Sequence, residues 1–383
     1  MYKKVSELSE EELKGKKVFL RVDFSVPVED GELKEIYQIK AHKETIDFLV
    51  SAGAKVALIS HAEKESIFFK DVVAKIEEIL GHQLGFEEDI LNPQLDSPLT
   101  LFENIRRYEG EETNDSGFAE DLAENFDLYV NDAFSVSHRN HASVSAIAEF
   151  SPPYAGFLMV KEIENLEKVL REPAEGKTLI LGGAKVSTKL PVIKNFLNSE
   201  GGAEHILIAG ALANAVFKSR GLNIGRSTAE DADISQALIE TDWASPQISL
   251  PQDIVVSESP AGGAAIEVLP IQNLKEEQYI LDIGPETVKR FSEIIKNSKM
   301  VIFNGPLGLA EINEFSTGTR MVLDSMIRSG AFTVLGGGDT LALVEKLGLL
   351  NKFSYVSTGG GAMLEFLAGV RLPGLEALRY YER

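Results

Sequence analysis

Apolar residues gather in short runs that recur along the whole chain. The runs lie at 17–22, 55–60, 99–103, 127–132, 178–183, 205–210, 252–256, 279–284, 299–305, 332–338 and 354–360. Most are continuous rather than alternating in hydrophobicity, which is typical of strands buried on both faces of a parallel sheet. Stretches with helical spacing separate most of them, for example 186–197, 285–295 and 317–327. The order strand, helix, strand predicts an α/β protein with doubly wound parallel sheets.

The number of predicted strands is enough for two sheets, and therefore for two α/β domains. Between them, the segment 159–172 is polar, carries Leu and Ile at helical spacing and is followed by Pro173. This pattern predicts one helix that connects the domains. We expect an N-terminal domain over 1–158, with the tail 370–383 packing back on it, and a C-terminal domain over 173–369.

Composition narrows the function classes. The formal net charge of −21 does not suit binding to DNA, RNA or anionic lipid. The chain has no cysteine, which excludes disulfides and thiolate metal sites. No apolar run approaches the roughly 20 residues of a membrane span, and the first residues do not have the pattern of a secretory signal. We expect a cytoplasmic protein that acts on small molecules.

Glycine-rich turns follow the apolar runs of the second half. They are GGAK (182–185), AGAL (209–212), DIGPET (282–287), NGPLG (304–308), GGGDT (336–340) and STGGG (357–361). In open α/β sheets, ligands bind at the carboxyl ends of the strands. Glycine lets the backbone approach a phosphate, and the start of the next helix attracts the anion. Packing explains one such turn, but six on one side of one sheet predict a nucleotide phosphate site. The sequence lacks the P-loop motif and offers poor support for a dinucleotide fold.

These turns, in this order, resemble the phosphoglycerate kinase family, and the likeness extends over nearly the whole chain. The segments that carry it are RVDFSVP (21–27), ENIR (103–106), YVNDAFSVSHRNHAS (129–143), LGGAKVSTK (181–189), FNGPLG (303–308), LGGGDT (335–340) and VSTGGGAMLEFLAG (356–369). The resemblance implies phosphoryl transfer between 1,3-bisphosphoglycerate and ADP, giving 3-phosphoglycerate and ATP, with Mg²⁺ required. It also implies a triose-binding N-terminal domain, a nucleotide-binding C-terminal domain, closure by a hinge, and a monomer in glycolysis and gluconeogenesis.

The nucleotide half matches the family pattern well. By the resemblance, Lys185 lies near the transferring phosphoryl group and Lys189 contacts the nucleotide phosphates. Asp339 opens a helix, where a carboxylate can cap the helix or hold Mg²⁺, and the resemblance favours the metal. The other implied nucleotide contacts are Gly210, Ala211 and Leu212 at adenine, Asn304, Glu311 at the ribose, and Gly337, Gly338 and Thr340 at the phosphates. Alanine replaces two family glycines in 209–211, which would narrow the adenine pocket by two methyl groups.

The triose half departs from the family at three positions. Ser25 replaces the asparagine of RVDFNVP. Lys64 replaces the arginine of HLGRP in the segment HAEKE (61–65), where Glu63 and Glu65 flank it. The triose-binding residues implied by the resemblance are Arg21, Asp23, Ser25, His61, Lys64, Arg106, His138 and Arg139. Arginine suits this task because its planar fork binds phosphate and carboxylate through two hydrogen bonds.

Position 38 is the most serious departure. The implied catalytic positions are Lys185, Gly338, Arg21 and position 38, and the family's arginine at position 38 is Gln38 here. An arginine that reaches a transferring phosphoryl group is worth roughly 10³–10⁵ in rate. Lys40 could compensate if the segment is extended, because it would then share a face with Gln38. Lys34 and Arg107 are also near in sequence; the alternative is that all three are surface charges.

Two functions therefore stay open. The first is a phosphoglycerate kinase, which the change at position 38 would make slow. The second is a nucleotide-binding homologue with lost or altered transfer, acting as a regulator or on another phosphorylated acid. The segment 66–97 is shorter than is usual in the family, and its effect on closure stays open. A purely structural role is least favoured, because six glycine turns at strand ends serve no packing need.

Overall fold

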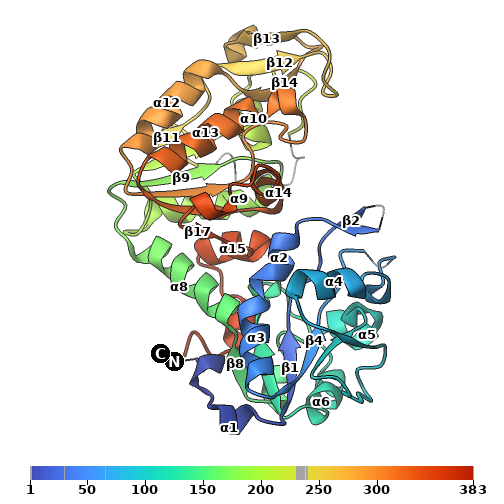
Figure 1. Cartoon of the computed structure of the whole chain (residues 1–383). Helices are drawn as coiled ribbons and strands as arrows, with labels where there is room; N and C mark the ends of the chain where they lie inside the picture. The colour runs from blue at the N-terminus through green and yellow to red at the C-terminus, as the bar shows by residue number, and fades with distance from the viewer. Residues whose placement is uncertain (1, 30, 65, 230–237, 239, 383) are drawn as a thin grey trace. The chain divides into compact units, whose positions relative to one another are not determined.

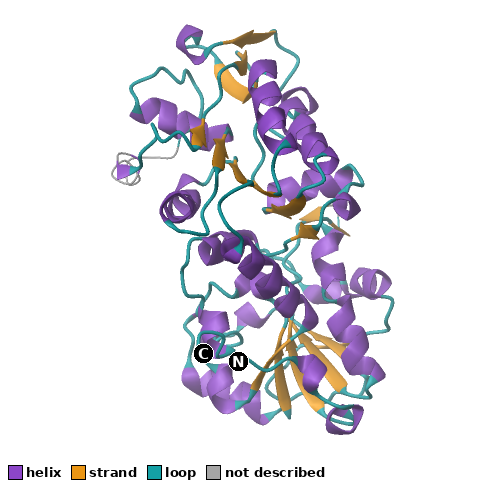
Figure 2. Cartoon of the chain, turned by 90° about the vertical axis from the view of Figure 1, so that its left-hand side faces the viewer, coloured by secondary structure: helices purple, strands orange, loops and turns teal. Residues whose placement is uncertain are grey.

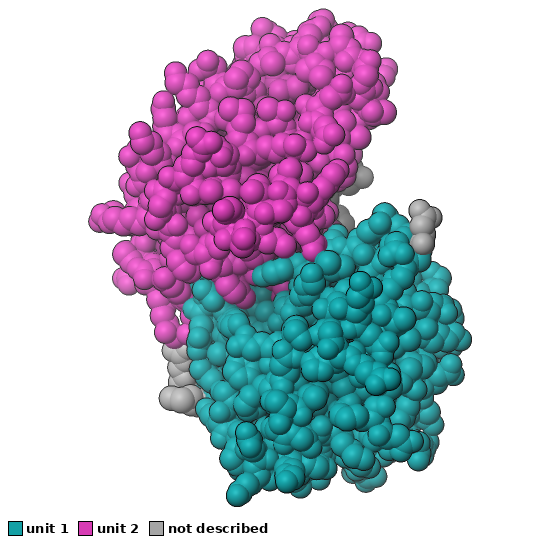
Figure 3. Space-filling model, in the orientation of Figure 1, with its two compact units in different colours: residues 1–165, 371–383 teal, residues 166–370 magenta. Residues whose placement is uncertain are grey.

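The computed structural model describes residues 2–29, 31–64, 66–229, 238 and 240–382. The chain divides into two compact units, one of residues 1–165 and 371–383 and one of residues 166–370 (Figure 3). Helix α8 (Phe157–Arg171) contains the boundary between them. The tail lies with the first unit, where Gly374 N donates to Ser137 O at 2.9 Å. Among the described residues, no helix is both long and apolar enough to cross a membrane.

A parallel sheet forms the centre of the first unit, with helices on both sides of the fanned strands (Figure 2). In the described residues it has six strands in the order β5-β6-β4-β1-β7-β8. The strands are β1 (Lys17–Arg21), β4 (Lys55–Ile59), β5 (Gly85–Glu87), β6 (Leu99–Phe102), β7 (Leu128–Asn131) and β8 (Pro153–Ala155). The helices are α1 (Glu10–Leu13), α2 (Ile36–Ala41), α3 (Lys43–Ser51), α4 (Val73–Leu80), α5 (Glu109–Glu112), α6 (Ser116–Glu124), α7 (Ile147–Phe150) and α16 (Pro373–Ala377). A small antiparallel pair, β2 (Val28–Glu29) and β3 (Glu32–Leu33), precedes α2.

Both faces of this sheet are buried, which explains the continuous apolar runs. Val18 and Leu20 of β1 belong to one core, whereas Phe19 between them belongs to the core on the opposite face. Successive side chains of a strand point to opposite faces, so a strand covered on both faces requires apolar residues at consecutive positions. The first unit thus confirms the predicted parallel α/β fold.

The second unit contains a second parallel sheet. In the described residues it has six strands in the order β11-β10-β9-β15-β16-β17. The strands are β9 (Lys177–Leu181), β10 (His205–Ile208), β11 (Ile248–Ser249), β15 (Met300–Asn304), β16 (Phe332–Gly336) and β17 (Tyr355–Val356). The helices are α9 (Val186–Asn198), α10 (Gly210–Ser219), α12 (Pro285–Lys296), α13 (Thr317–Arg328), α14 (Gly338–Lys346) and α15 (Gly360–Leu367). The chain order reverses between β9 and β15, which places a topological switch point between the turns that follow them.

Two predicted strands lie outside this parallel sheet. The runs 252–256 and 279–284 become β12 (Ile254–Ser257) and β14 (Tyr279–Ile283), which form an antiparallel sheet with β13 (Ile266–Leu269) (Figure 1). The interpretation of DIGPET as one of six turns at the edge of one sheet was therefore wrong. A short apolar run does not reveal whether its neighbour is parallel or antiparallel.

Candidate active site

The implied triose-binding residues of the first unit follow four neighbouring strands. Arg21 ends β1, His61 follows β4, and Arg106 lies in the short helix η3 (Ile105–Arg107) after β6. His138 and Arg139 follow the short helix η4 (Phe134–Val136) after β7. Because these strands are parallel and adjacent, their carboxyl ends meet at one edge of the sheet. The pKa of Arg106 is lowered by burial first and then by the charge of Arg139, so these two guanidiniums lie close together.

Arg21 is fully buried and is held by the protein itself. Its Nε donates to Ser143 Oγ at 2.8 Å, and its Nη1 donates to the carbonyls of Val22 and, at 3.4 Å, Ile59. Its Nη2 lies 3.3 Å from His61 Nδ1. A guanidinium has five N–H groups, so these four bonds to described residues leave one for a ligand. Arg21 therefore cannot offer a substrate the two-pronged fork that the sequence suggested.

His61 is neutral and Asp23 is ionised beside Arg21. Burial first, and then the charges of Arg21, Arg106 and Arg139, lower the pKa of His61 well below its ordinary value, so the ring is neutral at pH 7. Its Nδ1 faces an N–H of Arg21, which leaves the proton on Nε2. Burial opposes ionisation of Asp23, but His61, the hydroxyls of Ser135 and Ser25, and Arg21 lower its pKa to about 2. Because His61 is neutral, we attribute this mainly to the hydroxyls and Arg21.

Several nitrogens of this cluster lack partners. Arg106 Nη2, Arg139 Nε and His138 Nδ1 are buried and have no hydrogen-bond partner in the described part of the chain. Buried donors are normally satisfied, because an unmade hydrogen bond costs about 1–3 kcal/mol. Grouped cations with unmade bonds are the chemistry expected of a site for an anion. We refer to Arg21, His61, Arg106, His138 and Arg139 as the cationic cluster.

A buried carboxylate that the sequence analysis did not single out lies behind the cluster. Glu111 is fully buried and accepts hydrogen bonds from Ser143 N at 2.9 Å and Ser143 Oγ at 2.6 Å. The same Ser143 Oγ accepts from Arg21, so the hydroxyl joins the carboxylate to the guanidinium. His141 Nδ1 lies 3.6 Å from Glu111 Oε1. No motif marked Glu111, because it stands in an acidic run that reads as a solvated helix face.

The structure describes the three positions at which the chain departs from the family pattern. Ser25 donates its hydroxyl to Asp23 Oδ1 at 2.5 Å. Lys64 is exposed and lies 3.9 Å from Glu63, outside the cationic cluster. Glu65, the second carboxylate that flanks Lys64, lies outside the described residues. Gln38 is half-buried in α2.

Lys40 does not meet the condition under which it could compensate for Gln38, because the segment is not extended. Gln38 and Lys40 both lie in helix α2, where residues two apart point to roughly opposite sides. Lys34 is exposed and 3.9 Å from Glu29. Arg107 is exposed and its guanidinium lies over the ring of Phe68, 4.8 Å from the centroid. The surface interpretation of these three cations is the better one.

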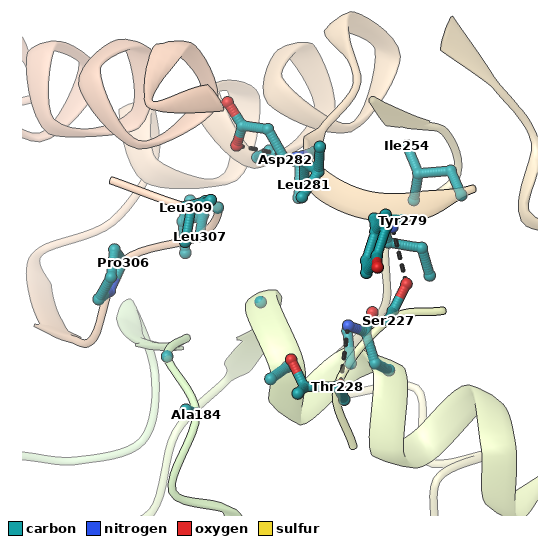
Figure 4. A pocket seen from close by; sticks show the side chains of 18 of the residues that line it. Ala184, Ser227, Thr228, Ile254, Tyr279, Leu281, Asp282, Pro306, Leu307 and Leu309 are labelled. Atoms are coloured by element: carbon teal, nitrogen blue, oxygen red, sulfur yellow. Dashed lines mark hydrogen bonds between the residues drawn. The ribbon is translucent and has the colours of Figure 1, made fainter. Parts of the chain in front are cut away.

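A cavity of about 340 Å³ lies in the second unit. In Figure 4, Ala184, Pro306 and Leu307 lie on one side of it, and Ser227, Ile254 and Tyr279 lie on the other. The first group belongs to the turns after β9 and β15, at the switch point of the parallel sheet. The second group adds the antiparallel sheet and the segment after α10. A mostly apolar cleft of this size with a few polar groups suits a nucleotide base and sugar.

The predicted nucleotide residues differ in where they lie relative to the cavity. Gly210, Ala211, Glu311 and Asp339 line the cavity. Leu212, Asn304, Lys189 and Thr340 are buried beneath the turns, and Lys185 and Gly338 are exposed beside them. Gly337 takes a φ of +94° at the start of α14. Of the two alanines in 209–211, Ala211 lines the cavity but Ala209 is fully buried and does not, so the prediction that both methyl groups narrow it was wrong.

Several glycines in these turns serve packing. A Cβ at Gly182 would lie 2.1 Å from Pro306 O, and one at Gly305 would lie 2.5 Å from Gly182 O. A Cβ at Gly210 would lie 2.8 Å from Gly183 N. Three turns therefore touch backbone to backbone, and the idea that these glycines have no packing role was wrong. At Gly338, by contrast, a Cβ would meet no described atom within 4 Å.

Asp339 lies in the first turn of α14, and Lys185 and Lys189 lie at the start of α9. Helix α14 has Gly337 as its N-cap without a side-chain capping bond, so the capping alternative for Asp339 is not observed. Its exposed carboxylate at the cavity is a suitable hard ligand for Mg²⁺. The described residues hold no group of three or more His, Cys, Asp or Glu side chains that could hold a metal ion. Lys185 is exposed, and Lys189 Nζ donates to Lys185 O at 3.3 Å.

Comparison with known proteins agrees with this geometry. The family model for phosphoglycerate kinase matches residues 8–370. The phosphoglycerate kinases of Rubrobacter xylanophilus and Geobacter metallireducens are 42% and 40% identical, each over 96% of this chain and 96% of its own length. The crystal structure of phosphoglycerate kinase from Pyrococcus horikoshii superposes with a TM-score of 0.87 at 31% identity, covering 99% of both chains. That from Coxiella burnetii has a TM-score of 0.83 at 30% identity and covers 100% of both. The chain belongs to the phosphoglycerate kinase family.

Proposed function

We propose that the chain transfers a phosphoryl group between 1,3-bisphosphoglycerate and ADP, with the triose at the cationic cluster and the nucleotide in the cavity of the second unit. Family membership supports the reaction. The distribution of charge supports the assignment of the two substrates. On a chain with a net charge of −21, a concentrated group of arginines and histidines is the feature that would attract an anionic triose.

The observation that carries the proposal is the set of unmade hydrogen bonds in the cationic cluster. Arg106 and Arg139 each bury a donor that no described residue satisfies. A phosphate or carboxylate would satisfy both donors and offset their mutual repulsion. Neutral His61 adds an Nε2–H donor that does not depend on protonation. Arg21 contributes its charge and one remaining N–H. The ionised Asp23 beside it adds a negative charge at the edge of the cationic cluster.

On the nucleotide side, the proposal assigns phosphate binding to the helix starts. The N-terminal ends of α9 and α14 carry the positive end of each helix dipole, and exposed Lys185 supplies a further positive charge. Gly338 leaves room for close approach of a ligand. Asp339 would hold Mg²⁺, which supplies charge stabilisation to the phosphoryl oxygens when it is bound. In this assignment Asn304 and Thr340 support the turns, because Thr340 Oγ1 accepts from Gly305 N at 3.1 Å.

Gln38 is the reason to retain a second candidate. A glutamine at this position can donate hydrogen bonds but has no charge, and none of Lys34, Lys40 and Arg107 joins the cationic cluster. A nucleotide-binding homologue that has lost transfer would show these features. We therefore propose slow but genuine transfer, since the arginines that would hold the triose are retained.

A coupled assay with 3-phosphoglycerate and MgATP, together with calorimetric titration of ADP, separates the two candidates. Turnover above background supports the kinase. Binding of ADP with no turnover would exclude it and favour the homologue. Exchanging each of two adjacent arginines for glutamine then tests the triose site. Arg106→Gln removes a charged hydrogen bond and should raise KM for 3-phosphoglycerate about tenfold or more. Arg107→Gln, on the exposed arginine over Phe68, should change it less than about twofold.

Two further proposals concern the location of the protein in the cell and its oligomeric state. We propose that the protein acts in the cytoplasm, which the absence of cysteine from the sequence supports. We propose that it acts as a monomer on small molecules, as the family resemblance implies. Analytical ultracentrifugation of the purified chain would test the oligomeric state directly.

A further inference from the structure

His42 is a buried histidine whose ring joins two parts of the first unit. It lies at the junction of α2 and α3 and is 1% exposed. Its ring packs edge-on against Phe24, with the centroids 5.8 Å apart. Neither the sequence motifs nor the proposed substrate contacts assign it a task. A buried polar ring normally has a hydrogen-bonding reason for its place.

Both ring nitrogens are engaged, and their partners fix the tautomer. Nε2 lies 3.0 Å from the backbone N–H of Asp23, so Nε2 accepts that hydrogen bond and carries no proton. Nδ1 lies 2.9 Å from Asp132 Oδ2 and therefore donates to the carboxylate. A ring nitrogen is set in this way by the bond that the other nitrogen makes.

Asp132 is itself anchored. It is fully buried, and its Oδ1 accepts from the backbone N–H of Leu158 at 2.9 Å and of Met159 at 3.3 Å, in the first turn of α8. A carboxylate at the start of a helix is favourably placed. The orientation of the imidazole is therefore fixed from the α8 side.

The other end of the ring holds the turn that begins after β1. Asp23 N is bound by His42, Phe24 N donates to Ser60 Oγ at 2.8 Å, and Ser25 N donates to Asp23 Oδ1 at 3.1 Å. Of these bonds, the one to His42 connects the backbone of the turn to Asp132 on the far side of the ring. The imidazole thus adds a connection between the backbone of Asp23 and Asp132, beside the pairing of β1 with β7 and the hydrogen bond that Ser135 Oγ donates to Asp23 Oδ2.

We propose that His42 is a positioning residue for the triose site. It holds the turn of Asp23, Phe24 and Ser25 where the substrate requires it, and Asp132 orients the ring. The competing explanation is that this network only stabilises the fold. The inference rests on the proposed triose site, because it assumes that the turn contacts the substrate.

Two substitutions separate the halves of the ring. The Nδ2 of His42→Asn would occupy the place of Nδ1 and keep the bond to Asp132, but nothing would accept from Asp23 N. The Oε1 of His42→Gln would reach the place of Nε2 and accept from Asp23 N, but the bond to Asp132 would be lost. Each variant loses one buried hydrogen bond, so their melting temperatures should fall by similar amounts.

Steady-state kinetics of the full chain distinguish positioning from stability. We expect His42→Asn to raise KM for 3-phosphoglycerate about tenfold, with KM for MgATP within twofold of the parent, and His42→Gln to restore KM for 3-phosphoglycerate to within about threefold. Equal effects of both variants on KM, or losses confined to melting temperature, would overturn the inference. If Arg106→Gln raises KM and His42→Asn does not, the inference fails alone. If neither raises KM, the triose site fails with it.

A third variant covers the case in which His42→Asn does not fold. Asp132→Asn keeps an oxygen that can accept from Leu158 N, but its NH₂ group then faces His42 Nδ1 and cannot accept from it. That group favours the tautomer in which Nδ1 has no proton and Nε2 carries it, so Asp23 N loses the acceptor that the oxygen of His42→Gln still provides. The same selective rise in KM for 3-phosphoglycerate is therefore expected. An unchanged KM in folded Asp132→Asn would overturn the proposal.

Discussion

Replacing Glu111 by glutamine tests the buried network behind the cationic cluster. The side chain keeps its size, so no cavity forms, but the negative charge disappears. The amide can accept from one of the two Ser143 donors, and its NH₂ group then faces the other. Arg21 also loses the buried carboxylate that Ser143 connects to it. Breaking one side of a buried, hydrogen-bonded charge pair costs about 3–5 kcal/mol. Since one hydrogen bond survives, we expect a loss of about 3 kcal/mol.

The measurement is thermal unfolding of Glu111→Gln beside Glu112→Gln. For a domain of this size, 1 kcal/mol corresponds to about 2–4 °C, so the transition of the first unit should fall by about 6–12 °C. Glu112 is the matched control, because its side chain is 58% exposed and lies 3.0 Å from Arg106 Nε. Arg106 is mostly buried, but the Glu112 end of the pair is largely exposed, and a pair that reaches solvent is worth at most about 1 kcal/mol. Similar losses in the two variants would refute the reasoning.

The pH dependence gives an independent check. Burial opposes ionisation of Glu111, but His141, Arg21 and Ser143 lower its pKa below the ordinary value of 4.5. A lowered folded pKa contributes stability that is present above the unfolded pKa and is lost as the pH falls through the folded pKa. The difference between the parent and Glu111→Gln should therefore be largest above about pH 5 and shrink below about pH 4. A difference that does not change with pH would show that packing, rather than charge, explains the loss.

Three further predictions concern other sites. Gln38→Arg should raise kcat in the coupled assay, by up to roughly 10³-fold if position 38 limits the rate; no rise would show that it does not. Burial raises the pKa of Asp282 to about 7, so its ionisation opposes folding as the pH rises from about 4 to 7. Asp282→Asn should therefore gain more stability at pH 8 than at pH 5 in chemical unfolding. Lys177 Nζ donates to three carbonyls, of Val169, Glu172 and Gly201, at 2.6–2.7 Å. Lys177→Met should lower the melting temperature by several degrees, while the exposed Lys299→Met should not.

The parallel sheets and the edge that carries the site were predictable from sequence. Runs such as 17–22 and 299–305 are buried on both faces, and this requirement is visible as unbroken hydrophobicity. The cationic residues were implied by the family resemblance, and each one ends or follows such a run. The sequence could not separate β12 and β14 from the parallel sheet, because an isolated apolar run has the same composition in either arrangement.

The supporting residues were not predictable for a different reason. Glu111, Ser143, His42 and Asp132 act through partners that are 19 to 122 positions away in sequence. Local pattern carries no signal for such pairs, because a buried glutamate and a solvated one look alike in an acidic run. The role of Lys40 stayed open in the sequence, because six residues of helix, α2, are too few to show a clear 3.6-residue period.

The touching glycine turns change how variation among relatives should be interpreted. At Gly182, Gly210 and Gly305 a side chain would collide with another turn, so selection for folding alone would preserve glycine there in a relative that had lost all activity. Gly338 is different, because the protein itself leaves space for a methyl group. Retention of glycine at position 338 across a lineage would therefore report selection for a bound ligand. In a deep mutational scan, substitutions at the first three positions should lower protein abundance. Substitutions at Gly338 should lower turnover in protein that accumulates normally.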